Sequence, residues 1–170
     1  MIAGVDWVTG NHQAGQPAVA NMSLGGGKSV ALEQAVANSI ADGVTYGVAA
    51  GNETEDACTG SPSGLPAAIT VGATESNDAR ASYSDFGSCV DFFAPGSNIT
   101  SASYLTDTGT ATMSGTSMAT PHVVGAAALY LQGAPASTPQ QVRDGLYNLT
   151  TKNIVTDARS ANAHLLFSNM

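Results

Sequence analysis

The chain of 170 residues is long enough for one compact domain and too short for two of ordinary size. Five basic against thirteen acidic residues give a net charge of −8, which argues against a nucleic-acid or anionic-membrane partner, because both need a cationic face. Charged residues make up only 11% and hydrophobic residues 43%, so disorder driven by charge is excluded and the composition is that of a tightly packed extracellular protein.

The N-terminus indicates a chain that begins within a domain. No basic stretch precedes an apolar one there, as it would in a secretory signal, and residues 1–8 instead resemble the middle of a helix. The longest apolar run, 123–131, is far shorter than the roughly 20 residues of a membrane span. We therefore expect residues 1–170 to form a single partial domain.

The first half of the chain predicts a strand, a helix and a second strand. A mostly apolar run at 17–24 ends in three glycines, which is typical of a buried strand that enters a loop. Ser29 is placed to cap a helix and Gly43 to end it. The side chains on one face of that helix are Leu32, Ala35, Val36, Ser39 and Ile40. The run 44–50 predicts the next strand, closed by a Gly-Asn pair.

The second half repeats this alternation. Residues 69–73 and 90–94 predict short strands separated by polar loops. A strand at 110–113 leads into a helix at 117–133, and the Thr-Pro pair at 138–139 marks the start of another helix. Because the strands are apolar throughout rather than alternating, they indicate a parallel sheet covered on both faces. The prediction is an α/β fold.

The segment Gly-Thr-Ser-Met-Ala-Thr-Pro-His at 115–122 carries the strongest chemical signal. A strand runs into Ser114 and Gly115, and a helix of small residues begins at or near Ser117. A serine there would be exposed on a tight turn, with the N–H groups of a helix N-terminus facing a developing oxyanion. The alternative is that Ser117 only caps the helix, which is the commonest role of a serine at such a junction. The spacing alone favours neither.

Two earlier segments add to this signal. Asn-Met-Ser-Leu-Gly-Gly at 21–26 and Ala-Ala-Gly-Asn at 49–52 precede the serine segment in that order. Together the three segments resemble the subtilisin-like serine proteases, most closely their proteinase K and aqualysin branch, and the resemblance runs from Ile2 to Phe167. It implies a three-layer subtilisin-like α/β fold with a mostly parallel sheet, whose N-terminal part is missing from this sequence.

The resemblance implies a role for each matching residue. Ser117 would be the nucleophile that forms an acyl-enzyme, and Asn52 would donate its amide to the oxyanion beside the Ser117 N–H. The edge that pairs with an extended substrate would consist of Ser23, Leu24, Gly25 and Gly26. One wall of the pocket for a bulky apolar P1 side chain would consist of Ala49, Ala50 and Gly51. Close packing of strand against helix is the alternative reason for these small residues.

The sequence departs from the family in the catalytic base. The family's aspartate and histidine both precede the serine, and no segment here matches either. His122 lies five residues after Ser117 on the same helix and would point away from it. His12 lies in a Gly- and Gln-rich loop and is expected to be exposed, and His164 matches non-catalytic family sequence. We therefore expect this chain alone to be essentially inactive.

Two other readings compete with a protease. One is a non-catalytic remnant, either a peptide-binding pseudoprotease or a fragment that never folds. The other is an α/β-hydrolase esterase, since Ser117, then Asp144 or Asp157, then His164 follow the chain order of its triad. Only 53 residues follow Ser117, which is few for the remaining sheet edge and both partner loops. The esterase reading also leaves Asn52 unexplained.

Two supporting sites follow from the resemblance. Cys58 and Cys89 could be free thiols or a disulfide, and their spacing of 31 positions matches a disulfide of aqualysin-like proteases. Asp91 matches a ligand of a structural Ca²⁺ in proteinase K-like enzymes, completed there by the carbonyls of Pro66 and Ala68, although a capping or surface aspartate is the plainer reading. Catalysis itself would need no cofactor.

The resemblance also implies partners and location. We expect a secreted monomer with polypeptide substrates, a propeptide or protein inhibitor as a further partner, and no nucleic acid or membrane partner. The acidic residues Glu53, Glu55 and Asp56 beside Asn52 could tune the charge preference for substrate, although a solvated loop is the plainer reading. An incomplete parallel sheet would expose apolar surface and a strand edge, so poor solubility is expected.

Overall fold

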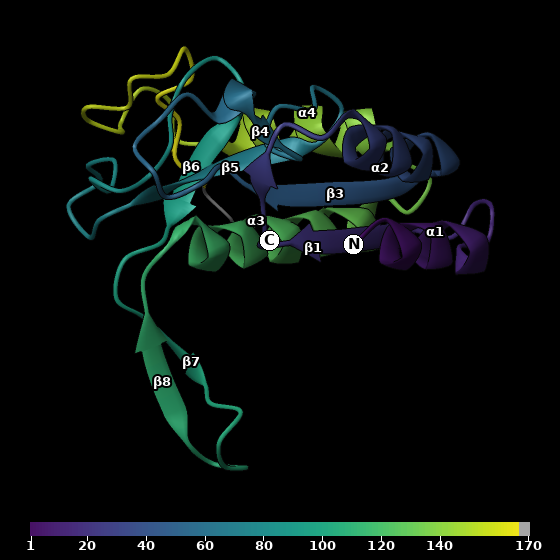
Figure 1. The fold of residues 1–170 in the computed structure, drawn as a ribbon, viewed down its shortest axis with the longest axis horizontal. Coiled ribbons are helices and arrows are strands. Elements are labelled where there is room, and N and C mark those ends of the chain that lie inside the picture. Colours follow the sequence, from purple (N-terminus) through teal and green to yellow (C-terminus); the bar gives the residue numbers. More distant parts are fainter. Residues whose placement is uncertain (167–170) are drawn as a thin grey trace.

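The computed structural model describes residues 1–166, so Phe167, the last residue of the family resemblance, lies outside them. A parallel sheet at its centre has the order β1-β3-β5-β6, with bounds β1 (Ala18–Met22), β3 (Val44–Ala49), β5 (Ile69–Thr74) and β6 (Phe92–Pro95). Figure 1 shows α2 (Val30–Asp42) on one side of β3 and α3 (Thr116–Gly133) on the other. The predicted α/β fold, with a parallel sheet covered on both faces, is confirmed.

The remaining elements extend this layered body. Helix α1 (Ile2–Asn11) packs against α2, and α4 (Pro139–Leu149) packs beside α3. A short antiparallel pair joins β2 (Gly26–Gly27) to β4 (Gly60–Ser61), next to the 3-10 turn η1 (Ala57–Thr59). Strands β7 (Ile99–Ala102) and β8 (Thr110–Met113) form an antiparallel arm that extends away from the body (Figure 1).

Local capping explains why the helices begin and end where they do. Ser29 accepts a hydrogen bond from the Leu32 N–H at the start of α2, as predicted. Gly43 ends that helix at φ +120°, a conformation that disfavours side chains. At the start of α4, Thr138 and Gln141 form a reciprocal capping box. Helix α3 begins at Thr116, one residue before the predicted start.

The strands are apolar throughout because each face of the sheet has its own core. Alternate residues of β3, Val44, Tyr46 and Val48, pack with α1 and α2. The other core joins Ile69 and Val71 of β5 to β6, α3 and α4. A side chain on either face of these strands is therefore removed from water, as expected for a doubly covered parallel sheet.

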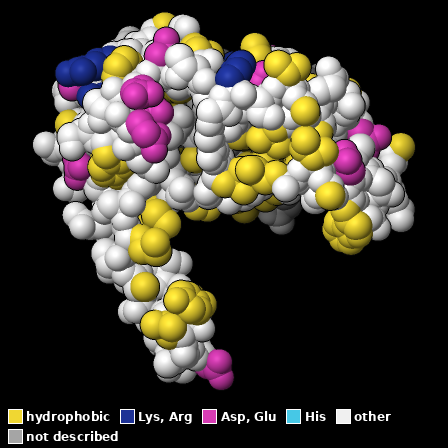
Figure 2. Space-filling view, in the orientation of Figure 1, with side chains coloured by type: hydrophobic (Ala, Val, Ile, Leu, Met, Phe, Trp, Pro, Cys, Tyr) yellow, Lys and Arg dark blue, Asp and Glu magenta, His cyan; other side chains and the backbone are white. Residues whose placement is uncertain are grey.

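Apolar surface is concentrated on the arm and on α1. Figure 2 shows hydrophobic side chains along the β7–β8 arm, where Tyr104 is 96% exposed and Leu105 and Met113 are also exposed. Trp7 on α1 is exposed too, and within residues 1–166 strand β1 pairs only with β3. The expectation of poor solubility rests on an exposed edge and apolar surface, and both are present here, while the solubility itself stays a prediction. Among the helices of residues 1–166, none combines the length and apolar character that crossing a bilayer requires.

The expectation that His12 is exposed is wrong. Its side chain is 5% exposed, because its ring lies over Gly43 and bridges the end of α1 to the end of α2. The ring nitrogens lie 2.7 Å from Asp42 Oδ2 and 2.8 Å from the Gln16 carbonyl oxygen. Both acceptors favour the doubly protonated ring. The hydrogen bond to the Gln16 carbonyl, followed by that to Asp42, therefore raises the pKa of His12.

This raised pKa predicts a pH-dependent contribution to stability. The His12 contribution should be fully present below the unfolded-state pKa of about 6.5 and should be lost as the pH rises through the higher folded-state pKa. His12→Ala should therefore lower the free energy of unfolding more at pH 5 than at pH 9, measured by urea denaturation. Asp42→Asn is the control and should shrink the difference between the two pH values. An equal effect of His12→Ala at both pH values would contradict the prediction.

Candidate active site

Ser117 lies in the first turn of α3, where a strand end and a helix start meet. Its hydroxyl donates to the Ser23 carbonyl oxygen at 3.2 Å, and the Ser23 hydroxyl donates to the Ser117 carbonyl oxygen at 2.7 Å. Gly115, the N-cap of α3, donates its N–H to the Gly96 carbonyl oxygen at 2.9 Å. The serine turn is therefore held from two sides, by the segment after β1 and by the segment after β6.

Asn52 is oriented by the residue before the serine. Its Oδ1 accepts hydrogen bonds from the Thr116 N–H at 2.8 Å and from Thr116 Oγ1 at 3.0 Å. Because the oxygen end of the amide is bound in this way, the Nδ2 donors face away from Thr116. Among residues 1–166, neither Asn52 Nδ2 nor the Ser117 N–H donates to a protein group. Two unsatisfied donors, one of them from the first turn of a helix, thus lie next to the serine.

Asp85 shapes the loop that carries Asn52. Its Oδ1 accepts the N–H groups of Glu53 and Glu55, each at 2.9 Å. Gly51 adopts φ +122°, and a Cβ there would lie 2.1 Å from Asp85 Oδ2. The buried Asp85 carboxylate therefore occupies the space that a side chain at position 51 would need. This arrangement, with the bonds from Asp85 to the loop, holds the start of the loop, where Asn52 lies.

The predicted substrate-binding residues gather around one pocket of about 470 Å³. Leu24, Gly25 and Gly26 line one part of it, and the segment 49–52 lines another, together with Ser117. Ser23 is not among the lining residues and instead contacts the serine turn directly. Segments from three distant parts of the sequence are thus brought together at Ser117.

The acidic residues near Asn52 have distinct contacts. Glu53 and Glu55 line the pocket, and Glu53 Oε2 accepts the Asn52 N–H at 2.7 Å. Asp56 instead caps η1 by accepting the Cys58 N–H at 3.0 Å. Two of the three acidic residues therefore line the pocket, and the third caps a 3-10 turn.

No histidine of residues 1–166 is hydrogen-bonded to Ser117. His122 Nδ1 bonds to the Met118 carbonyl oxygen at 2.8 Å within α3. His164 lies between Tyr147 and Asn153, at 2.9 and 3.1 Å, and burial lowers its pKa, which favours the neutral ring.

The arrangement required of an α/β-hydrolase is also absent from the described residues. Asp144 accepts from Gln140, and Asp157 pairs with two arginines. Neither aspartate nor His164 is hydrogen-bonded to Ser117. Within residues 1–166, the residues of the esterase alternative are therefore not assembled into a triad.

Comparisons with known proteins agree with this geometry. The profile of the Subtilase family matches residues 1–166. The chain belongs to the Subtilase family. It is 59% identical over 166 residues to an extracellular serine proteinase of Thermus sp. (strain Rt41A), covering 98% of this chain and 40% of that protein. It is 54% identical over 168 residues to alkaline serine exoprotease A of Vibrio alginolyticus, covering 99% of this chain and 31% of that protein.

Two solved protease structures share this fold. A crystal structure of a cold-adapted subtilisin-like serine proteinase superimposes with a TM-score of 0.94 at 53% identity, over 99% of this chain and 60% of that one. A protease from Pseudoalteromonas arctica gives a TM-score of 0.84 at 28% identity, over 97% of this chain and 55% of that one. The subtilisin-like fold and the proteinase K and aqualysin type are thus confirmed, in a chain that spans less than half the length of the two curated relatives.

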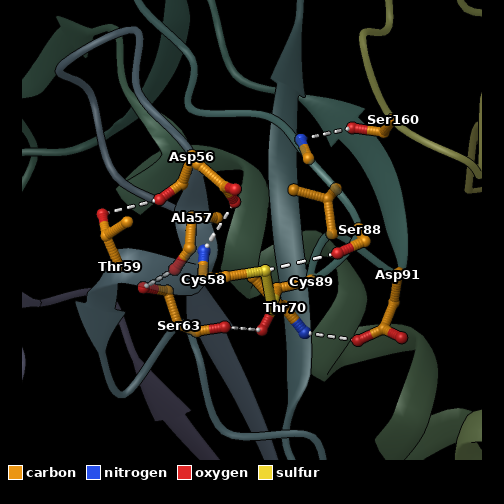
Figure 3. The surroundings of a disulfide bond; sticks show 12 residues. Asp56, Ala57, Cys58, Thr59, Ser63, Thr70, Ser88, Cys89, Asp91 and Ser160 are labelled. Atoms are coloured by element: carbon orange, nitrogen blue, oxygen red, sulfur yellow. Dashed lines mark hydrogen bonds between the residues drawn. A yellow bond between two sulfur atoms is a disulfide. The ribbon is translucent and has the colours of Figure 1, made fainter.

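The cysteines of this subtilase form the disulfide that the resemblance implied. Cys58, in η1, is bonded to Cys89, just before β6 (Figure 3). The bond closes a loop that contains all of β4 and β5. It therefore ties the segment after Asn52 to the edge of the sheet.

Removing the disulfide should destabilise the fold. For a loop of 31 positions, chain entropy predicts a loss of about 3–4 kcal/mol for the double variant Cys58→Ser/Cys89→Ser. Urea unfolding of the variant and of the oxidised parent measures the difference. The double variant should be insensitive to reductant, whereas the parent should lose stability on reduction. A loss below about 1 kcal/mol would contradict the entropy argument.

Two of the three residues expected to bind Ca²⁺, Asp91 and Pro66, are brought together, but both are bound to a protein cation. Arg143 of α4 donates to Asp91 Oδ1 and to the Pro66 carbonyl oxygen. Burial raises the pKa of Asp91 to about 6, against the opposing effect of the Arg143 charge. Residues 1–166 contain no group of three or more His, Cys, Asp or Glu side chains suited to a metal. As arranged here, the set does not fit a calcium ion.

Three residues of these sites were missed by the sequence reasoning. Thr116 was noted only as part of the serine segment, although a threonine directly before the predicted nucleophile was a usable signal. Asp85 is 32 positions from Glu53, and Arg143 is 52 positions from Asp91. No local pattern links residues so far apart, so only the folded chain reveals these contacts.

Proposed function

We propose that this chain carries the nucleophile and the oxyanion site of a secreted subtilisin-like serine endopeptidase. The observation that carries the proposal is that Thr116 binds Asn52 Oδ1, while within residues 1–166 neither Asn52 Nδ2 nor the Ser117 N–H donates to a protein group, and both residues line the same pocket. Ser117 Oγ would attack the peptide carbonyl, and these two donors would stabilise the resulting oxyanion. The leaving amine would depart, and water would then hydrolyse the acyl-enzyme.

The base is the part of this mechanism that the chain does not supply. The Ser117 proton must pass to a base and then to the leaving amine, and the histidines of residues 1–166 are bonded elsewhere. In the family pattern, the aspartate and histidine come from segments that precede the serine. We propose that the chain needs such a segment to be active, and that its exposed β1 edge adjoins it.

The residues that line the pocket support the proposal that the substrates are polypeptides and that the preference for the P1 side chain is broad but favours apolar groups. Ala49, Ala50 and Gly51 line it and leave room for a large side chain, while the backbone at 24–26 is exposed for pairing with an extended substrate. The Glu53 and Asp85 carboxylates are engaged by backbone N–H groups of the loop, so they are not free to pair with a basic P1 group without changing that loop. Secretion is supported by the Thermus relative, which is named an extracellular proteinase.

A fluorophosphonate probe tests the proposal directly. The test protein, here called the completed protein, is this chain fused behind the segment of the Thermus proteinase that carries that family's aspartate and histidine. We expect labelling of Ser117, cleavage of peptide substrates with Phe or Leu at P1 in preference to Lys, and loss of both with Ser117→Ala. A folded completed protein that binds peptides but is neither labelled nor active would instead support the pseudoprotease alternative.

A further inference from the structure

Arg143 lies where the family resemblance places a calcium ion. One of its terminal nitrogens, Nη2, donates to Asp91 Oδ1, and the other, Nη1, donates to the carbonyl oxygen of Pro66. Two of the three protein ligands expected for the ion are therefore bound to a single guanidinium. The same side chain thereby joins α4 to segments that lie 52 and 77 residues earlier in the sequence.

The other oxygen of Asp91 is also engaged. Asp91 Oδ2 accepts the Thr70 N–H of β5 at 2.8 Å, a bond visible beside the disulfide in Figure 3. The Asp91 side chain is only 8% exposed, so it cannot turn toward another partner without burying an unsatisfied N–H. Calcium takes six to eight oxygen ligands, and here both oxygens of the only carboxylate of the set are already engaged by protein donors.

The charge balance leads to the same conclusion. The guanidinium is permanently protonated in proteins and is matched in shape to a carboxylate and a carbonyl acceptor. Arg143 is 27% exposed, so most of its side chain is covered between α4 and the Pro66 loop. A calcium ion at Asp91 would have to displace this cation, because two positive charges in contact with one carboxylate repel each other at short range.

We propose that Arg143 replaces calcium at this position as a cation tethered to the protein, so that Asp91 and Pro66 are held together without a metal. The tethered cation cannot be removed by a chelator or diluted away, whereas a bound ion can. Stability contributed by this position should therefore be independent of calcium in this chain, and removing the guanidinium should create a calcium-dependent site from Asp91 and the carbonyls of Pro66 and Ala68.

Thermal unfolding in excess calcium or in EDTA tests this proposal. The parent protein should unfold at the same temperature in both. Arg143→Ala should unfold at a lower temperature in EDTA, and calcium at about a hundred times its dissociation constant should raise its Tm by about 5–10 °C. Arg159→Ala is the matched control, because it removes an exposed arginine side chain that pairs with Asp157 and is hydrogen-bonded to neither Asp91 nor Pro66, and it should not respond to calcium.

Two further variants keep the test decisive. Adding Asp91→Asn to Arg143→Ala should abolish the acquired calcium response. If Arg143→Ala does not fold, Arg143→Gln should show the same calcium response. Glutamine removes the positive charge that excludes calcium, and it retains an amide donor that can support the fold. The proposal would be overturned if calcium raised the Tm of the parent protein and Asp91→Asn abolished that rise. It would also be overturned if the Arg143 variant gained no larger rise in Tm with calcium than the parent shows.

Discussion

This chain alone should cleave peptides about a million-fold more slowly than the completed protein. Loss of the histidine alone has that effect on turnover in subtilisin, a member of the same family, from which the value is taken. The physical reason in this chain is that the Ser117 hydroxyl donates to the Ser23 carbonyl oxygen, which cannot accept the proton as a base would. A million-fold change corresponds to a barrier about 8 kcal/mol higher.

Two measurements check this expectation. Turnover of a chromogenic peptide is compared between the chain alone and the completed protein, and the rate of fluorophosphonate labelling at Ser117 is followed by intact mass. Adding Ser117→Ala to the completed protein gives the background for both. Circular dichroism of the chain alone distinguishes a folded chain without a base from an unfolded one. Labelling of the chain alone at a rate near that of the completed protein would show that a base lies within these residues.

The elements whose signals are local were predicted well. Both ends of α2 depend on single residues, the Ser29 cap and Gly43, and the start of α4 depends on the box between Thr138 and Gln141. The two-sided burial of the parallel strands follows from their unbroken apolar character. Capping and strand burial act within a few residues, so a single sequence is enough to reveal them.

Features that depend on distant partners were harder to predict. Strand β6 starts at Phe92 rather than at residue 90, because its bounds are set by pairing with β5. Strand β8 was predicted, but its pairing with β7 in an exposed arm was not. In α4, helical periodicity places Val142 and Leu146 in the core, but it cannot show that Arg143 reaches Asp91 across the fold.

The candidate site was predicted through three segments rather than through contacts. The family resemblance placed Ser117, Asn52 and the segment 23–26 in one site, and these residues do surround one pocket or contact the serine turn. The resemblance did not reveal that Asp85 shapes the loop after Asn52, because a lone carboxylate in a polar loop has no distinguishing pattern. The same holds for the bonds between Thr116 and Asn52.

Replacing Asn52 by leucine in the completed protein should lower kcat by about 10²–10³-fold with little change in KM. The magnitude is the one measured for the corresponding asparagine of subtilisin. The effect should fall on kcat because, under the proposed function, the amide would donate to an oxygen that becomes negatively charged only in the transition state. Leucine is close to asparagine in size, so the pocket should keep its shape.

The bonds from Thr116 provide a matched pair of variants for this prediction. Thr116→Val removes the hydroxyl that donates to Asn52 Oδ1 but keeps the N–H that also holds it, so kcat should fall only about 5–10-fold. Thr116→Ser keeps both donors and should be near the parent. Steady-state kinetics of the four proteins, with urea unfolding to confirm folding, decides the matter. If Asn52→Leu stayed within about threefold of the parent kcat, Asn52 would not be an oxyanion donor, and the Ser117 N–H would have to stabilise the charge without it.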